Sequence, residues 1–320
     1  MKRRDILTLG AGLLAAPQVL AQGPAWPNRT VRLVVPYIPG SAPDVIARNL
    51  AERISASIGQ SVVIENRGGA GGNIGNEFAA RAAPDGYTIL LGTNALLTNP
   101  ALTSRRLGYD VYRDFVPITV AFAMPHCLVV PMSGPATTAA LIADLKAKPG
   151  QPYASGGNGS GAHLAAELFK AATQVEAVHV PFRGAPDIVN NVMAGNVNFG
   201  FPTLATVTEL IKSGRLRGLG VTSAQRNHAL PDTPSVGETV PGFDLTSWFA
   251  VMGIAGMPDV AMTRINAAIQ AALADPAFRA RTTADGSIAV GMGPEQFATF
   301  LRSEDRKWTE AVRISGAKVD

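Results

Sequence analysis

The stretch that decides the fold reads VRLVVPYIPGSAPD at residues 31–44, and a segment with helical spacing follows it. Residues 31–35 are a short, mostly apolar run that ends at a proline, which is typical of a buried strand. Beyond the loop, apolar side chains recur on one helix face, namely Val45, Ile46, Leu50, Ile54 and Ile58. A strand, a loop and a helix in this order indicate an α/β fold.

The same alternation continues to the end of the chain. We expect further strands at 61–65, 87–91, 128–131, 177–181, 196–201 and 216–222, and helices at 138–146, 164–172, 188–193, 259–274 and 294–314. Strands that alternate with helices predict mainly parallel sheets flanked by helices.

The length of 320 residues predicts two domains. Because no linker rich in Ser and Pro divides the chain, we expect it to cross between the domains more than once. We place the crossings near residues 125 and 250. One lobe then consists of residues 22–125 plus 250–320, and the other of residues 126–249.

Residues 1–21 have the three features of a secretory signal peptide: a basic start, an apolar stretch and small residues at a cleavage site after Ala21. The apolar run is short for a membrane span, so an uncleaved anchor is the less favoured alternative. The pair Arg3-Arg4 resembles a twin-arginine signal, and it leaves that route and the general export route equally open. We therefore expect an exported, periplasmic protein.

The composition excludes several classes of protein. Hydrophobic residues make up 47% and charged residues only 16%, unlike a disordered chain or a coiled coil. The 28 Lys and Arg nearly balance the 24 Asp and Glu, so we expect no nucleic-acid partner. Cys127 is the one cysteine, which excludes an internal disulfide, and we expect it in the core.

Three loops hold many of the 33 Gly and 23 Pro. The first, residues 36–44, joins the first strand to the first helix, and Ser41 and Asp44 fit a capping box there. Such a loop also lies where α/β folds bind ligands, so capping and binding are both open. The second, residues 66–75, lacks the pattern of a phosphate-binding loop, and we favour close packing as the reason for its glycines.

The third loop, residues 155–163, also joins a strand to a helix. Gly157, Gly159 and Ala162 satisfy the dinucleotide-binding pattern by letter, but the acidic residue about 20 positions on, Glu176, would begin a strand instead of ending one. Asn and Ser side chains beside free amides suit a carboxylate equally well. The residues alone leave these two interpretations open.

No catalytic constellation is apparent. The four histidines, His126, His163, His179 and His228, lack metal-binding spacing. Ser160 does not lie in a nucleophile elbow. His163, at the start of a helix beside the third loop, is the histidine with the best claim to a site. These absences favour a binding protein over an enzyme.

The chain resembles the Bug (TctC-like) family, the substrate-binding receptors of tripartite tricarboxylate transporters. The resemblance extends from about residue 26 to residue 320. It rests on VPY at 35–37, PG at 39–40, DVIAR at 44–48, VIENR at 63–67, GAGGNIG at 69–75, APDGYT at 83–88, GNGS at 157–160, HLA at 163–165, HVPFRG at 179–184, ALPDTPSV at 229–236 and SWF at 247–249.

The resemblance implies a two-lobed, Venus-flytrap fold of type II that closes on a ligand by a hinge motion. It implies a small organic carboxylate as ligand, a membrane permease as partner, and neither cofactor nor metal; we expect a monomer. The implied ligand-binding residues are Tyr37, Ser41, Asp44, Thr93, Asn94, Asn158, Ser160, His163, Arg183, Gly184, Pro202 and Thr203.

Two departures from the family pattern bear on the ligand. Ser41, Ala42 and Pro43 stand where the family usually has glycines and a Thr, and Pro202 stands where an Asp is common. The resemblance therefore implies a less polar or differently charged ligand than an acidic amino acid, such as an aromatic or short-chain acid. An exported dinucleotide-dependent enzyme that uses the loop at Gly157 and Gly159 is the alternative function.

Overall fold

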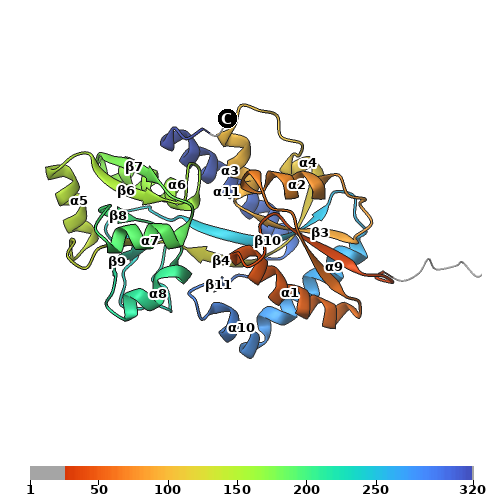
Figure 1. The fold of residues 1–320 in the computed structure, drawn as a ribbon. Helices are drawn as coiled ribbons and strands as arrows, with labels where there is room; N and C mark the ends of the chain where they lie inside the picture. The colour runs from red at the N-terminus through yellow and green to blue at the C-terminus, as the bar shows by residue number, and fades with distance from the viewer. Residues whose placement is uncertain (1–25, 319–320) are drawn as a thin grey trace, which may run out of the picture.

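The computed structural model describes residues 26–318, which form two β-sheets, each flanked by helices (Figure 1). The signal peptide expected at residues 1–21 lies outside the described residues. The predicted α/β class with flanking helices is confirmed.

The first sheet takes strands from both ends of the chain, in the order β11-β4-β10-β3-β1-β2. Its strands are β1 (Val31–Val35), β2 (Val62–Asn66), β3 (Thr88–Thr93), β4 (Phe115–Pro125), β10 (Thr246–Ile254) and β11 (Ile288–Ala289). The helices of this half are α1 (Ala42–Ile58), α2 (Asn73–Ala80), α3 (Ala95–Leu102), α4 (Val111–Asp114), α9 (Asp259–Ala274), α10 (Pro276–Thr283) and α11 (Pro294–Ser315), with a short 3₁₀ helix, η1 (Ala70–Gly72).

The second sheet comes from one continuous part of the chain, in the order β7-β6-β8-β5-β9. Its strands are β5 (Cys127–Val130), β6 (Gln151–Ser155), β7 (Ala177–Pro181), β8 (Phe199–Gly200) and β9 (Arg217–Val221). Its helices are α5 (Thr138–Ala147), α6 (Gly161–Thr173), α7 (Ala185–Met193) and α8 (Leu204–Lys212), and a 3₁₀ helix, η2 (Val236–Glu238), follows.

Both sheets are mixed, which corrects the expectation of mainly parallel sheets. β1 is parallel to β2 and β3, and β6 is parallel to β7 and β8. β10 is antiparallel to β3 and β4, while β5 is antiparallel to β8 and β9. The reason is the path of the chain: β4 leads out of the first half and β10 leads back beside it, so the two must run in opposite directions.

The two halves are joined by these neighbouring strands. Only His126 separates the end of β4 from the start of β5, so the chain passes almost straight from one sheet into the other. β10 pairs with the whole length of β4, and Figure 1 shows both strands running between the halves. The lobe bounds expected from the sequence stay a prediction.

The last long helix, α11, packs against α3 of the first half and α6 of the second. Its Glu304 is 2% exposed and accepts hydrogen bonds from the indole N–H groups of Trp248 on β10 and Trp308. Lys307 lies 2.7 Å from the same carboxylate and balances its charge. This buried cluster fixes α11 to a strand that joins the halves.

Candidate ligand-binding cleft

A cavity of about 750 Å³ lies between the two halves and is lined by residues of both. Its first wall is made by residues that follow the carboxyl ends of parallel strands: Tyr37 after β1, Gly71 after β2 and Asn94 after β3. Carboxyl ends of parallel strands meet at the same edge of a sheet, which is where open α/β sheets bind ligands.

The facing wall is built by the same rule. Gly156 follows β6, Gly184 follows β7, and Pro202 and Thr203 follow β8; all four line the cavity. Each half therefore contributes three strand ends to one cavity. The two walls also approach each other directly, since a Cβ at Gly159 would lie 2.4 Å from Leu102 of α3.

Several helices begin at the cavity. Asn94, Ser160, Gly184 and Thr203 are the capping residues of α3, α6, α7 and α8, and all four line it. The first amides of a helix have no partner within the helix, and the helix dipole adds positive potential there. The cavity thus collects hydrogen-bond donors suited to an anion.

The rest of the lining is largely uncharged. Apolar side chains come from Leu102, Leu107 and Ile188. Arg105 is the one charged side chain among the described residues that line the cavity. A small anion with an apolar body fits such a lining, because the polar groups are few and converge from helix ends.

Seven of the expected ligand-binding residues line the cavity: Tyr37, Asn94, Asn158, Ser160, Gly184, Pro202 and Thr203. The other five are not among the lining residues, and these are Ser41, Asp44, Thr93, His163 and Arg183. For four of these five, hydrogen bonds within the protein supply the physical reason.

Asp44 closes its own loop instead of facing the cavity. It is 2% exposed, and its carboxylate accepts hydrogen bonds from the Gly40 amide, Arg48 and Asn66. Burial raises the pKa of Asp44, but these hydrogen bonds outweigh burial and hold the pKa below its ordinary value. The Ser41 hydroxyl donates to the carbonyl of Ile38, so it also serves the loop.

Thr93 and His163 lie one layer behind the cavity wall. The Thr93 hydroxyl lies 2.9 Å from the Tyr37 hydroxyl and accepts from the Ala95 amide, so it orients a residue that does line the cavity. His163 is 4% exposed, and its Nδ1 accepts from the amide of Gly159 in the third loop. Arg183 is exposed.

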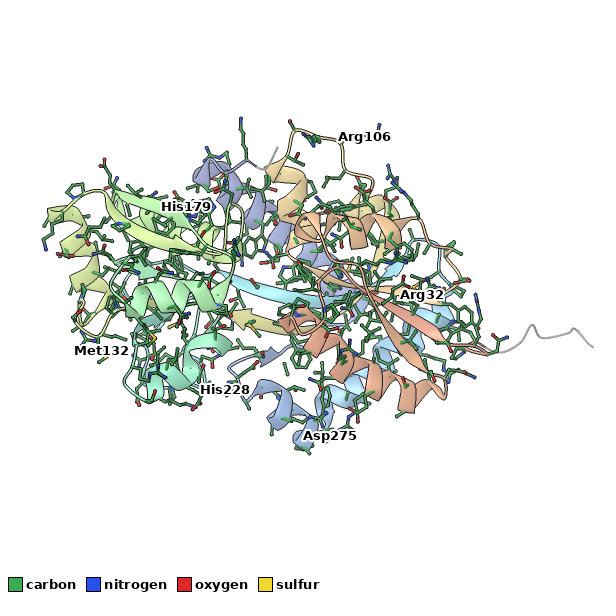
Figure 2. The ribbon with its side chains drawn as sticks, viewed as in Figure 1. Arg32, Arg106, Met132, His179, His228 and Asp275 are labelled. Atoms are coloured by element: carbon green, nitrogen blue, oxygen red, sulfur yellow. The ribbon has the colours of Figure 1, made fainter. Side chains whose placement is uncertain are left out.

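His163 belongs to a polar cluster behind the third loop. Its ring stacks on that of His179, at 4.1 Å between centroids, and Ser155 is hydrogen-bonded to His179. Figure 2 shows His179 in the second half of the molecule. Tyr153 donates to Glu167, which also binds Lys170. Burial, with the neighbouring His179, lowers the pKa of His163 to about 4, so the ring is neutral and can accept from Gly159.

Several groups of lining residues are not predicted from the sequence. One is α3 with the segment after it, which supplies Leu102, Arg105 and Leu107, and another is the side chain of Ile188 on α7. The second loop contributes Ala70 and Gly71 beside Asn73, and the Asn99 side chain donates to Gly71 and Asn73 and holds this loop to α3. Its position after a strand was the signal that predicted the other two loops. His126 and Ser247 lie on the joining strands, where no local pattern indicates a ligand.

Among residues 26–318, the side chains of His, Cys, Asp and Glu form no group of three or more that could hold a metal ion. No helix in that part of the chain combines the length and the apolar character that a membrane span requires.

Two mixed α/β halves, joined by neighbouring strands and enclosing a cavity lined by strand ends, define a two-lobed binding protein of type II. Solved structures share this architecture over 92% of the chain, and one of them is described as a periplasmic transporter. The chain belongs to the family described as "Tripartite tricarboxylate transporter family receptor", whose family model matches residues 46–316. The predicted family and fold class are thereby confirmed.

Three similar proteins illustrate the family. Protein BugT of Bordetella pertussis is 35% identical over 310 residues, which cover 96% of this chain and 94% of BugT. Rpa4515 of R. palustris, solved with adipate, is 34% identical, covers 92% of this chain and 100% of its own, and has a TM-score of 0.81. MatC of Rhodopseudomonas palustris, solved with bound malate, is 26% identical over 90% of this chain and 100% of its own, with a TM-score of 0.76.

Proposed function

We propose that the protein is a periplasmic receptor that holds a small organic carboxylate between its two lobes and delivers it to a membrane permease of the tripartite tricarboxylate transporter type. The observation that carries the proposal is the convergence of the first turns of α3, α6, α7 and α8 on one cavity. Helix starts bind carboxylates through free amides.

The charges of the cavity support an anionic ligand. The described lining residues include Arg105 and no Asp or Glu, so a carboxylate meets no like charge there. Two relatives with the same fold were solved with adipate and malate, which are both dicarboxylates. Leu102, Leu107 and Ile188 favour a ligand with an apolar part, in line with the loss of an acidic group at Pro202.

The ligand contacts that we propose follow the cavity. Asn158, Ser160 and Gly184 face the ligand from one lobe, and Tyr37 and Asn94 from the other. Asp44, Thr93 and His163 position the loops through hydrogen bonds. The dinucleotide alternative has less support, because Glu176 precedes β7 and lies at the end of that strand away from Gly184.

Thermal unfolding with a panel of mono-, di- and aromatic carboxylates tests the proposal. A ligand at about 100 times its Kd adds about 2.7 kcal/mol to the stability. Replacing Asn158→Ala and Ser160→Ala together should abolish this gain. Ser160 also caps α6, so Thr137→Ala, which removes the cap of α5, is the matched control and should keep the gain.

Two outcomes would contradict the proposal. One is a panel in which no carboxylate stabilises the protein, and the other is a ligand-induced gain that the double variant retains in full. A cofactor absorbance in the purified protein would favour the dinucleotide alternative. N-terminal sequencing of the periplasmic fraction tests the proposed location, and the mature chain should begin after Ala21.

A further inference from the structure

His126 and Ser247 form a hydrogen-bonded pair in the cavity wall, at the strands that join the two lobes. His126 lies between β4 and β5, and Ser247 lies on β10. The His126 ring is 4% exposed; its Nδ1 lies 2.8 Å from the carbonyl oxygen of Phe201, and its Nε2 lies 3.1 Å from the Ser247 hydroxyl oxygen. Both residues line the cavity.

The Phe201 carbonyl determines where every proton in this pair lies. A carbonyl oxygen can only accept, so Nδ1 of His126 must carry the hydrogen of that bond. Burial lowers the pKa of His126 to about 4, although the bond to Phe201 acts in the opposite direction, so the ring is neutral at pH 7. Nε2 is then an acceptor, and the Ser247 hydroxyl donates its one proton to it.

The oxygen of Ser247 is consequently left with acceptor capacity only. Its proton is engaged by His126, while its lone pairs remain open toward the cavity that it lines. This differs from the helix starts around the cavity, which offer N–H donors. A ligand group that meets Ser247 must therefore donate a hydrogen bond.

The acceptor lies directly beside an anion-binding helix start. A Cβ added to Gly161, the first residue of α6, would lie 2.7 Å from Nε2 of His126 and 3.3 Å from the Ser247 oxygen. The backbone of Gly161 is thus packed against the pair. A carboxylate on the first amides of α6 would hold its neighbouring carbon atoms next to Ser247.

We propose that Ser247, oriented by His126, selects carboxylates that carry a hydroxyl group one or two carbons from the carboxyl carbon. This inference rests on the proposed receptor function and names its ligand class: 2-hydroxy and 3-hydroxy acids. A hydroxyl suits the site better than an ammonium group, because the described lining holds Arg105 and no carboxylate that would balance a cation.

Calorimetric titration of matched ligand pairs tests this inference. The pairs are malate and succinate, lactate and propionate, 3-hydroxybutyrate and butyrate, and 2-hydroxybenzoate and benzoate. In at least one pair, the hydroxylated member should bind the wild-type protein about tenfold more tightly, the effect of one hydrogen bond that the other member cannot make.

Substitutions of Ser247 and His126 then test whether these two side chains cause the preference for the hydroxylated acid. Ser247→Ala should bring the affinities of the two acids in that pair to within about twofold of each other, because the acceptor for the ligand hydroxyl is gone. Ser247→Thr retains the hydroxyl and should restore the preference. His126→Phe frees the serine proton, so the preference should shrink although Ser247 is present. Ser41→Ala removes a hydroxyl outside the cavity and should change nothing.

The failures of the two proposals can be told apart. If acids bind but the hydroxyl brings no gain in any pair, or if Ser247→Ala keeps the full preference, the selection by Ser247 is wrong while the receptor function stands. If no carboxylate binds to the wild-type protein, both proposals fail together.

Discussion

Gly161 begins α6 without a side chain, and His126 and Ser247 occupy the space where its Cβ would lie. Asp44 in the first loop is the opposite case, because its carboxylate already accepts hydrogen bonds from Gly40, Arg48 and Asn66. In both cases the neighbouring atoms decide the role. Gly161 shapes the cleft, whereas Asp44, although it is placed like a ligand contact in the sequence, holds a loop together.

Gly161→Ala should weaken ligand binding at least tenfold and also lower the stability, because the displaced ring of His126 is buried. The backbone of Gly161 is not in the left-handed region, and Ala is tolerated in a first helical turn, but the new Cβ displaces His126. Calorimetry and thermal unfolding of the same samples measure the two effects. Gly293→Ala, at the start of α11 where a Cβ meets nothing within 4 Å, is the matched control. Full affinity in the Gly161 variant would contradict the assignment of α6 to the ligand.

At the scale of elements, α11 does more than cover a sheet. It packs against α3 and α6, which belong to different halves, and its Glu304 holds Trp248 of the strand β10. A carboxylate that is 2% exposed is tolerable only because two indole N–H groups and Lys307 satisfy it. We therefore expect the position of α11 to depend on this single side chain.

Glu304→Ala should lower the free energy of unfolding by about 3 kcal/mol or more, since it leaves two buried indole donors without a partner. Urea unfolding followed by tryptophan fluorescence measures the change. Glu310→Ala removes an exposed pair with Arg313 on the same helix and should lower the free energy of unfolding far less than Glu304→Ala does. Equal losses of stability in the two variants would show that the buried cluster contributes no more than an exposed ion pair does.

The elements that the sequence predicts well are those with a local signature. The strand at 31–35 and the helix at 259–274 match β1 and α9 residue for residue. The long joining strands were not predicted. β4 is buried along most of its length, so its residues do not alternate between polar and apolar as in a half-buried strand. It also contains Pro117, which argues against a central strand. A register shift in the pairing of β4 with β10 lies beside that proline.

The residues that line the candidate cleft also fall into two groups, those with a local signature in the sequence and those without one. The family resemblance implied Tyr37, Asn94 and Asn158, and each of them also follows a strand, at the edge of the sheet where α/β folds bind ligands. His126 and Ser247 could not be predicted, since their contact depends on the pairing of β4 with β10, which are more than 100 positions apart in sequence. Non-local register is not encoded in any short pattern.

At the scale of the whole molecule, two buried histidines, His126 and His163, and the half-buried His179 make stability depend on pH. Burial lowers the pKa of His126 and His163 to about 4, and it also lowers that of His179. The ordinary value is 6.5. Between pH 6.5 and 4 the unfolded chain therefore binds protons that the folded protein does not, so stability falls as the pH falls through this window.

Urea unfolding at several pH values should show this decline below pH 6.5, with a slope of about 1.4 kcal/mol per pH unit for each proton. His163→Gln should reduce this slope by about 1.4 kcal/mol per pH unit, the contribution of one proton. His228→Gln, in which the replaced ring is at the surface (Figure 2), is the control. A slope that His163→Gln leaves unchanged would exclude this histidine from the effect.

The strand order also constrains how the chain assembles. The second sheet uses residues 127–221 without interruption, so it can form from one continuous segment. The first sheet needs β10 between β3 and β4, and that strand begins only at Thr246. Contacts between distant parts of a chain form slowly, because a long loop must close first. Newly synthesised chains should therefore complete the second lobe early, and the cleft should form only after β10 has been made.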